Sequence, residues 1–384
     1  MITVVDAIPD VCKGQPWSFG LYAVLPFLRK HVLYTPDPRR ARIHVLPERN
    51  PWNHSECDGL YLHRWLEDKY EPFKNASNLI VHMNFCDLVT DCQYVKHDFS
   101  NYPPEFSPAS PTRRYIYLTW NGRSDGADSG DVNKCTGCVQ RLKDVVMPTA
   151  HNACGPLCGS ATVDMLRRFA VWSADAPNKL LDAIQYVETW PQRRYNVYWA
   201  GQVKLDLQRP NADTRDDISG RGEFYRLFHS QNDSYVRNSY NWKNDLAVDR
   251  EMPPILEMMR NSTFCFSPLG RVGGDHDRYI PALLTGCIPI ILKSVLVAGQ
   301  VQHITQPYED IIEWKKIAVM IHAEDVHKLP FILNHVNIIS KRANVFKVWR
   351  KLLYSSHYGS HLGESSVDDA LHTLVDVLQL RAWA

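Results

Sequence analysis

The chain has 384 residues, 45% of them apolar, which is too long for one ordinary hydrophobic core and predicts two domains. Its 43 basic and 42 acidic side chains nearly cancel, so the net charge excludes nucleic acid as an expected partner. No basic segment followed by an apolar one opens the sequence, and no run of about 20 apolar residues occurs. We therefore expect contact with a membrane only through an anchor that is absent from this chain.

The first half of the chain alternates runs of strand length with segments that can form helices. Residues 60–70 have the apolar spacing of an amphipathic helix. Short runs of β-branched and aromatic residues occupy 41–47, 78–85 and 114–119. The alternation predicts a parallel sheet covered by helices, and we assign residues 1–190 to an N-terminal Rossmann-like domain.

Cysteines are concentrated in this N-terminal part, with a Cys-rich insertion at about 120–160. Two pairs stand 15 residues apart within it, a spacing that suits either a four-thiolate zinc site or two disulfides. The four residues are Cys135, Cys138, Cys154 and Cys158. Four triplets also fit the acceptor pattern for N-glycosylation, which permits a lumenal location without establishing it. They begin at Asn53, Asn75, Asn232 and Asn261.

The second half of the chain repeats the alternation of helix and strand. Residues 160–188 carry a helical pattern interrupted by Pro177. Strand-like runs follow at 195–200, 263–267 and 287–292. Strand, helix and strand at this spacing form the βαβ unit of a doubly wound sheet, so we predict a second domain over 191–340 and a C-terminal helical segment over 341–384.

The most informative segment is 262–290, in which a buried strand runs into a glycine-rich loop and then a helix. The loop holds Gly270, Gly273 and Gly274. Asp275 or Asp277 can cap the helix that Gly286 ends, and Pro281 falls in the first turn, where a missing N–H is tolerated. This arrangement directs backbone N–H groups into the crevice at the carboxyl ends of the strands, where phosphates bind in open α/β sheets.

Arg278 lies beside that helix end in the sequence. A nucleotide diphosphate gains negative charge as it leaves, and a guanidinium with backbone donors can stabilise it without a metal. We therefore predict that Arg278 is catalytic. The alternative is a turn that only connects strand and helix, with Arg278 paired to Asp275 or Asp277.

Five segments together resemble one family. Segment 262–290 has the Ser-x-Phe-Cys strand, the Pro-x-Gly loop, an arginine and the Gly-Cys-Ile-Pro strand start of the exostosin family, glycosyltransferase family 47. Four other segments resemble its motifs in the same order. They are Tyr34–Pro47, Lys143–Pro148, Arg194–Gly201 and Gln306–Val319.

The resemblance implies an α/β chain of GT-B architecture, with two Rossmann-like doubly wound domains facing a central cleft. It further implies an inverting glycosyltransferase of the Golgi or secretory lumen that requires no metal and no cofactor. The donor would be a nucleotide diphosphate sugar, UDP-linked by expectation, and the acceptor a glycan or glycoprotein. In that compartment the paired cysteines of the insertion are expected as disulfides. Cys265 and Cys287, inside apolar strand patterns, are expected as buried free thiols.

The resemblance also assigns site residues by position. The donor site would comprise Gly201, Arg221, Ser267, Gly270, Gly273, Gly274, Asp275, Asp277, Arg278 and Gly286. An inverting reaction needs a general base as well, and Asp87 and His151 are candidates because each follows a strand-like run of the N-terminal domain. One departure from the family pattern is Pro281, which stands where an acidic residue usually does.

Two other functions remain open at this point. The loss of an acidic residue at Pro281 allows a catalytically inactive, glycan-binding or scaffold protein of the same fold. A GT-B phosphorylase or epimerase-like enzyme is the third reading. Fold resemblance cannot identify donor sugar, acceptor or linkage.

Overall fold

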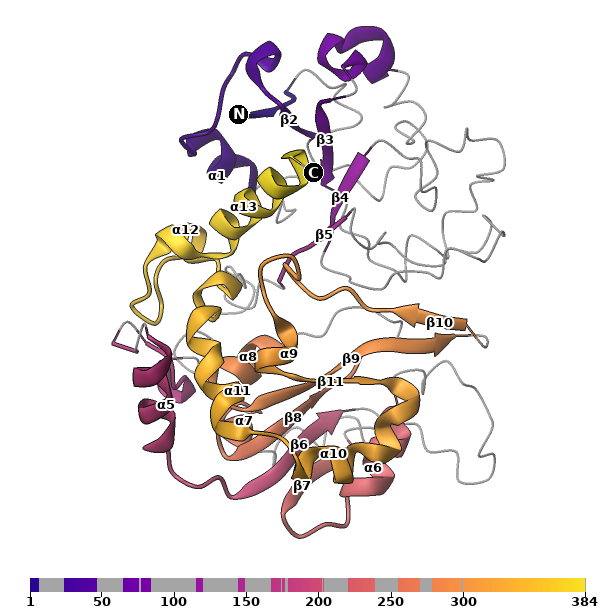
Figure 1. Ribbon diagram of the computed structural model, residues 1–384, viewed down its shortest axis with the longest axis vertical. Coiled ribbons are helices and arrows are strands. Elements are labelled where there is room, and N and C mark those ends of the chain that lie inside the picture. The colour runs from indigo at the N-terminus through magenta and orange to yellow at the C-terminus, as the bar shows by residue number, and fades with distance from the viewer. Residues whose placement is uncertain are drawn as a thin grey trace, which may run out of the picture. The chain divides into compact units, whose positions relative to one another are not determined.

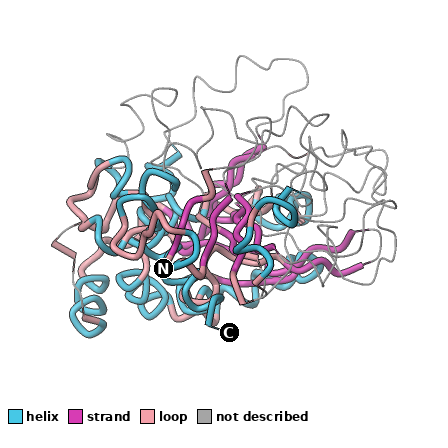
Figure 2. The backbone as a smooth tube through the Cα atoms, turned by 90° about the horizontal axis from the view of Figure 1, so that it is seen from above, coloured by secondary structure: helices cyan, strands magenta, loops and turns pink. Residues whose placement is uncertain are grey.

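The computed structural model describes most of the chain as two α/β units. It covers residues 1–6, 24–46, 65–75, 77–83, 115–119, 144–148, 167–173, 175–176, 179–201, 203, 220–238, 255–269, 278–297 and 300–383. Unit 1 consists of residues 1–147 and 371–384, and unit 2 of residues 148–370. Figure 1 labels their elements, and Figure 2 distinguishes helices, strands and loops along the backbone. The predicted boundary near residue 190 therefore falls inside unit 2.

Unit 1 is built on a parallel five-stranded sheet in the order β1-β2-β3-β4-β5. The strands are β1 (Ile2–Val4), β2 (Ile43–Leu46), β3 (Leu79–Met83), β4 (Tyr115–Thr119) and β5 (Val145–Val146). All three strands predicted in this half are confirmed as β2, β3 and β4, and 65–69 are helical, as expected for 60–70. The described strands of this unit follow chain order without a reversal.

Two helices that are far apart in the sequence belong to unit 1. They are α1 (Leu25–Lys30) and α13 (Ala370–Trp383), and the ring of Phe27 on α1 lies edge-on to that of His372 on α13 at 4.8 Å. Leu371, Leu374 and Leu378 are fully buried, so one face of α13 contributes to a hydrophobic core. The predicted C-terminal segment 341–384 is thus divided between the units.

Unit 2 contains a six-stranded sheet in the order β10-β9-β8-β6-β7, with β11 also paired to β9. Its strands are β6 (Tyr195–Gly201), β7 (Ser234–Asn238), β8 (Ser262–Ser267), β9 (Ile288–Val297), β10 (Gln300–His303) and β11 (Val319–His322). The three strands predicted in this half are confirmed as β6, β8 and β9. All pairings are parallel except that of β10, which runs antiparallel to the second half of β9.

Alternate residues of β8 face different layers. Phe264 and Phe266 join a hydrophobic core with Phe224 and Phe228 of α6 (Arg221–Phe228) and Leu333 of α10 (Leu329–Asn334). Cys265 and Ser267 point to the opposite face by the two-residue period of a strand. The helices on the chain between β7 and β9 are α7 (Ile255–Arg260) and α8 (Tyr279–Leu284).

The remaining helices of unit 2 explain why residues 148–190 belong to unit 2, although the sequence analysis assigned them to the N-terminal domain. They are α5 (Leu180–Glu188), α9 (Trp314–Ile317), α11 (Ile338–Asn344) and α12 (Ser355–Tyr358). α5 packs against α11, so the segment before residue 190 belongs to the second core rather than the first. Among the described residues no helix is both long enough and apolar enough to span a bilayer.

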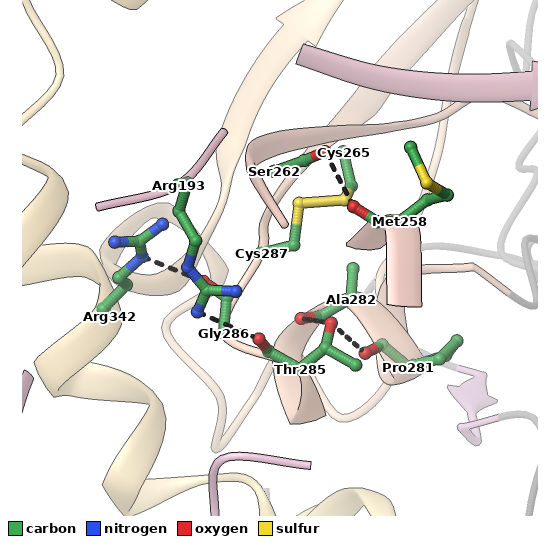
Figure 3. The surroundings of a disulfide bond; sticks show 10 residues. All are labelled: Arg193, Met258, Ser262, Cys265, Pro281, Ala282, Thr285, Gly286, Cys287 and Arg342. Atoms are coloured by element: carbon green, nitrogen blue, oxygen red, sulfur yellow. Dashed lines mark hydrogen bonds between the residues drawn. A yellow bond between two sulfur atoms is a disulfide. The ribbon is translucent and has the colours of Figure 1, made fainter. Parts of the chain in front are cut away.

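A disulfide joins Cys265 of β8 to Cys287, which directly precedes β9 (Figure 3). The prediction of buried free thiols at these positions was wrong. An apolar pattern shows that both residues are buried, but only the parallel pairing of β8 with β9 brings their Cα atoms to 5.8 Å, within the range of a disulfide. The bond closes a loop that contains the glycine-rich segment and Arg278. The paired cysteines of the 120–160 insertion lie outside the described residues.

We expect the double substitution Cys265→Ser with Cys287→Ser to lower the free energy of unfolding by about 3 kcal/mol, because it releases a 22-residue loop closure in the unfolded chain. Urea unfolding of the oxidised wild type and the variant measures the difference. Wild type unfolded and refolded under reducing conditions serves as the control. A variant as stable as the oxidised wild type would contradict the expectation.

His44 is a buried titratable group in the core of unit 1. Its imidazole is fully buried in β2, and its Nδ1 lies 2.8 Å from the hydroxyl oxygen of Tyr70. Burial lowers the pKa of His44 to about 4. The folded state therefore keeps this side chain neutral at pH values where the unfolded chain protonates it.

This difference predicts an acid-sensitive unit 1. As pH falls from 6.5 to 4, the unfolded state takes up a proton at His44 that the folded state does not, so stability falls by up to about 3 kcal/mol. Above pH 6.5 the contribution is complete. Urea unfolding at several pH values should show a shallower loss for His44→Gln than for wild type across this window. Identical pH profiles would refute the assignment.

Candidate functional site

The order of the unit 2 strands reverses between β6 and β8. Chain order proceeds outward from β6 to β7, then returns to β8 on the other side of β6 and continues to β9 and β11. Such a reversal separates the connections at the carboxyl ends of the two central strands, and open α/β sheets bind ligands there. Gly201 ends β6 and Ser267 ends β8, so these two predicted donor-site residues lie at the reversal.

Arg278 connects the two sides of this reversal. It stands immediately before α8, on the connection that follows β8, and its Nη1 donates a hydrogen bond to the carbonyl oxygen of Ala200 in β6. The guanidinium is also close enough to Tyr198 to oppose the effect of burial, which raises the pKa of that hydroxyl to about 12. The structure thus brings Arg278 together with the end of β6, where Gly201 lies.

Arg221 makes the reciprocal connection. It is the first residue of α6, which follows β6, and its Nη2 donates to the carbonyl oxygen of Leu269 beyond β8. The preceding Gly220 has φ 66°, and a Cβ there would meet Val326 at 2.6 Å, so glycine is required for this entry into the helix. Two guanidinium groups therefore reach across the reversal from opposite connections.

Two buried polar atoms at these strand ends have no hydrogen-bond partner among the described residues. They are Ser267 Oγ and Trp199 Nε1. The Trp199 ring leans toward the end of β6, because a Cβ on Gly201 would lie only 2.7 Å from it. A buried donor normally finds a partner, so both atoms are suited to hydrogen-bond a ligand oxygen.

Trp199 was not among the residues predicted from the sequence. Its position two residues before the strand-ending Gly201 was a usable signal, since alternate strand residues face the same side. The indole also packs in the core of unit 2, where it contacts the rings of Phe224 and Phe266.

Gly286 does not join this cluster. It follows α8 at the end opposite Arg278, with φ 75°, and a Cβ there would meet Trp190 at 2.5 Å. Its conformation and close packing give it a structural role at the amino end of β9. The donor-binding role assigned to it by position gains no support from this placement.

The other predicted site residues lie outside the described residues. They are Gly270, Gly273, Gly274, Asp275, Asp277, Asp87 and His151. Pro281 is described: it is the third residue of α8 and is buried, in keeping with the tolerance of proline in a first helical turn. No three His, Cys, Asp or Glu side chains among the described residues could together hold a metal ion, and metal independence stays a prediction.

Comparison with known proteins points to one family. Residues 171–336 match the profile of the exostosin GT47 domain. A probable glycosyltransferase of Arabidopsis thaliana is 31% identical over 100 residues, which are 25% of this chain and 18% of that protein. A probable glucuronosyltransferase of Oryza sativa subsp. japonica is 27% identical over 178 residues, 41% of this chain and 40% of the relative. Exostosin-1 of Drosophila melanogaster is 30% identical over 103 residues, 27% of this chain and 12% of the relative.

The matched segments thus span less than half the length of each of these relatives. A crystal structure of an alpha1,3-fucosyltransferase aligns with the whole chain and 90% of its own length, at 12% identity and a TM-score of 0.32. The profile covers three of the five family-like segments, those beginning at Arg194, Ser262 and Gln306, together with the strand reversal. Residues 171–336 match the exostosin GT47 domain, and in this part the chain is similar to glycosyltransferases of the exostosin family.

Proposed function

We propose that this protein transfers a sugar from a nucleotide diphosphate sugar, UDP-linked by expectation, to a glycan or glycoprotein acceptor with inversion and without a metal. The observation that carries the proposal is the position of Arg278, which joins the two sides of the strand reversal inside the GT47 domain. Crevices at such reversals bind phosphorylated ligands in open α/β sheets. Ser267, Trp199 and Arg221 supply further hydrogen-bond donors around the same strand ends.

The proposed reaction forms one bond and breaks one. The acceptor hydroxyl oxygen bonds to the anomeric carbon on the face opposite the nucleotide, and the carbon–oxygen bond to the diphosphate breaks, with its electron pair leaving on the diphosphate. A base takes the hydroxyl proton, for which Asp87 and His151 remain the candidates from the sequence. Arg278 stabilises the charge that develops on the diphosphate, because a guanidinium matches a phosphate oxygen pair in charge and geometry.

The proposed location is the Golgi or secretory lumen. Asn75 and Asn232, each in an acceptor triplet for N-glycosylation, have exposed side chains. The disulfide between Cys265 and Cys287 is also of the kind that persists in an oxidising compartment. Both features support the proposal.

Turnover with a panel of UDP- and GDP-linked sugars in the presence of EDTA tests the whole proposal. Transfer or donor hydrolysis should occur with at least one donor, and the anomeric configuration of the product should be opposite to that of the donor. A strict requirement for a divalent cation would contradict metal independence, and retention of the anomeric configuration would contradict the inverting mechanism.

A second candidate is a catalytically inactive glycan-binding protein, favoured by Pro281. This buried residue puts no carboxylate where the family pattern has one that could bond donor hydroxyls. Calorimetry separates the two functions: an inactive glycan-binding protein should bind an oligosaccharide but no nucleotide sugar, and a transferase should bind both.

Arg278→Gln should lower kcat about 10²–10³-fold, because it removes the positive charge from the developing diphosphate. Arg226→Gln is the matched control, since Arg226 is exposed on α6 and pairs with Glu223. Steady-state kinetics measures both, and thermal unfolding shows whether each variant is folded. If a folded Arg278→Gln enzyme retains wild-type kcat, the assigned role fails.

Ser267→Ala and Ser262→Ala should have opposite effects, although both are buried serines of β8. Ser267 Oγ has no partner among the described residues, so its removal should leave stability unchanged or higher and weaken UDP binding about tenfold or more. Ser262 Oγ donates to the carbonyl oxygen of Met258, so its removal should cost about 1 kcal/mol of stability and leave UDP binding unchanged.

Calorimetric titration with UDP and urea unfolding measure the two effects. Equal UDP affinity in wild type and Ser267→Ala would show that this hydroxyl does not contact the nucleotide.

A further inference from the structure

Two arginine side chains converge at the end of α8 that is opposite Arg278. Arg193, from the segment between α5 and β6, donates from Nη2 to the carbonyl oxygen of Thr285 at 3.1 Å. Arg342, from α11, donates from Nε to the carbonyl oxygen of Gly286 at 2.9 Å. Figure 3 shows both guanidinium groups reaching this last turn from different parts of the chain.

Trp190 fixes the two guanidinium groups in place. The Cζ atoms of Arg193 and Arg342 lie 5.6 Å and 5.7 Å from the centroid of its ring. Gly286 makes room for this packing, because a Cβ there would lie 2.5 Å from the Trp190 ring and 2.7 Å from Arg193 Nη2. Cation–π contact and close packing therefore hold two like charges side by side.

In the part of the chain that the structure describes, no neighbouring acid balances the charges of this pair. Among the described residues no Asp or Glu forms a salt bridge with Arg193 or Arg342. Burial lowers the pKa of Arg193 to about 9, with repulsion from Arg342 and Arg260 adding to it. Burial also lowers the pKa of Arg342 to about 10. The carbonyl groups at the helix end offset only part of two full charges.

Hydrogen-bond donors are in excess as well. Arg193 Nε and Arg342 Nη2 are buried and have no partner among the described residues, and the Arg342 residue is only 8% exposed. The hydrogen bonds to the end of α8 use Arg193 Nη2 and Arg342 Nε, and they leave Arg193 Nε and Arg342 Nη2 unpaired among the described residues. Arg193 and Trp190 are partly exposed, so a small ligand can approach them from solvent. Planar donor groups with unbalanced positive charge are the features that recognise an oxyanion.

We propose that Arg193 and Arg342, held by Trp190, form a binding site for a single oxyanion, either a carboxylate or a tetrahedral sulfate or phosphate group. The site is distinct from the donor crevice, because it lies at the opposite end of α8 from Arg278. Binding there should stabilise the α8 segment, because Cys287, three residues after the end of α8, is tied to β8.

Thermal unfolding of the full chain with inorganic sulfate or chloride, at equal ionic strength, tests the proposal. At a sulfate concentration about tenfold above the Kd measured by calorimetry, the wild-type Tm should rise about 3–6 °C more than in chloride. Arg193→Gln and Arg342→Gln should lose this difference. Arg194→Gln, which changes an exposed neighbour, should retain it and so corrects for the general stabilising effect of sulfate.

Arg342→Lys keeps the test valid if Arg342→Gln does not fold. Lysine retains the charge and can still donate a hydrogen bond to the carbonyl oxygen of Gly286. The Arg342→Lys variant should fold and bind sulfate at least several-fold more weakly than wild type, since it loses the planar set of donors. Titrations with phosphate and with glucuronate, compared with neutral glucose, distinguish a free inorganic ion from an acidic group carried on a sugar. Sulfate binding of equal strength in wild type and both glutamine variants, or no binding of any of these anions, would overturn the proposal.

Discussion

The parallel pairing of β6 with β8 is the constraint on which the candidate site depends. These strands are separated in sequence by α6, β7 and α7, yet they lie next to each other, so the connections that follow them leave in different directions. This pairing places the described candidates at the strand reversal. Arg278 hydrogen-bonds from the β8 side to β6, and Arg221 hydrogen-bonds from the β6 side to the segment after β8. Loss of the pairing would separate both arginines from their acceptors.

The neighbouring pair of β8 with β9 gives this region its rigidity. Its disulfide is buried, and Arg193 and Arg342 hold the end of the α8 segment that leads into Cys287. A short helix of six residues has little stability of its own, so such tertiary contacts must determine its position. Preorganisation of this kind is useful where a guanidinium must meet charge that develops only during the reaction.

Sequence patterns were sufficient for the parts of the structure that rest on local periodicity. Apolar runs located β2, β3, β4, β6, β8 and β9, because buried parallel strands have continuous apolar runs. The edge strand β7, Ser234–Asn238, was missed because its burial is mixed and its sequence polar. The boundary near 190 was misplaced for a similar reason: packing of α5 on α11 is a contact between distant segments that periodicity cannot reveal.

The sequence located the candidates that end a strand, but it could not indicate contacts between side chains from distant segments. Ser267 and Gly201 follow directly from strand ends, whereas the pairing of Cys265 with Cys287 depends on strand register. Gly286 shows the limit of transferring a role by position, since its backbone conformation already explains why glycine stands there. Arg342 reaches Gly286 from 56 residues away, which no local pattern could indicate.

Because α13 belongs to unit 1, the order in which the two units can fold during synthesis is restricted. Unit 2 is one continuous stretch, whereas unit 1 is assembled from residues 1–147 and 371–384. A fragment that stops at residue 147 lacks α13, whose Leu371, Leu374 and Leu378 are fully buried, and would expose the apolar surface that this helix covers. During synthesis, unit 1 therefore cannot be completed until α13 has left the ribosome, after all of unit 2 has emerged.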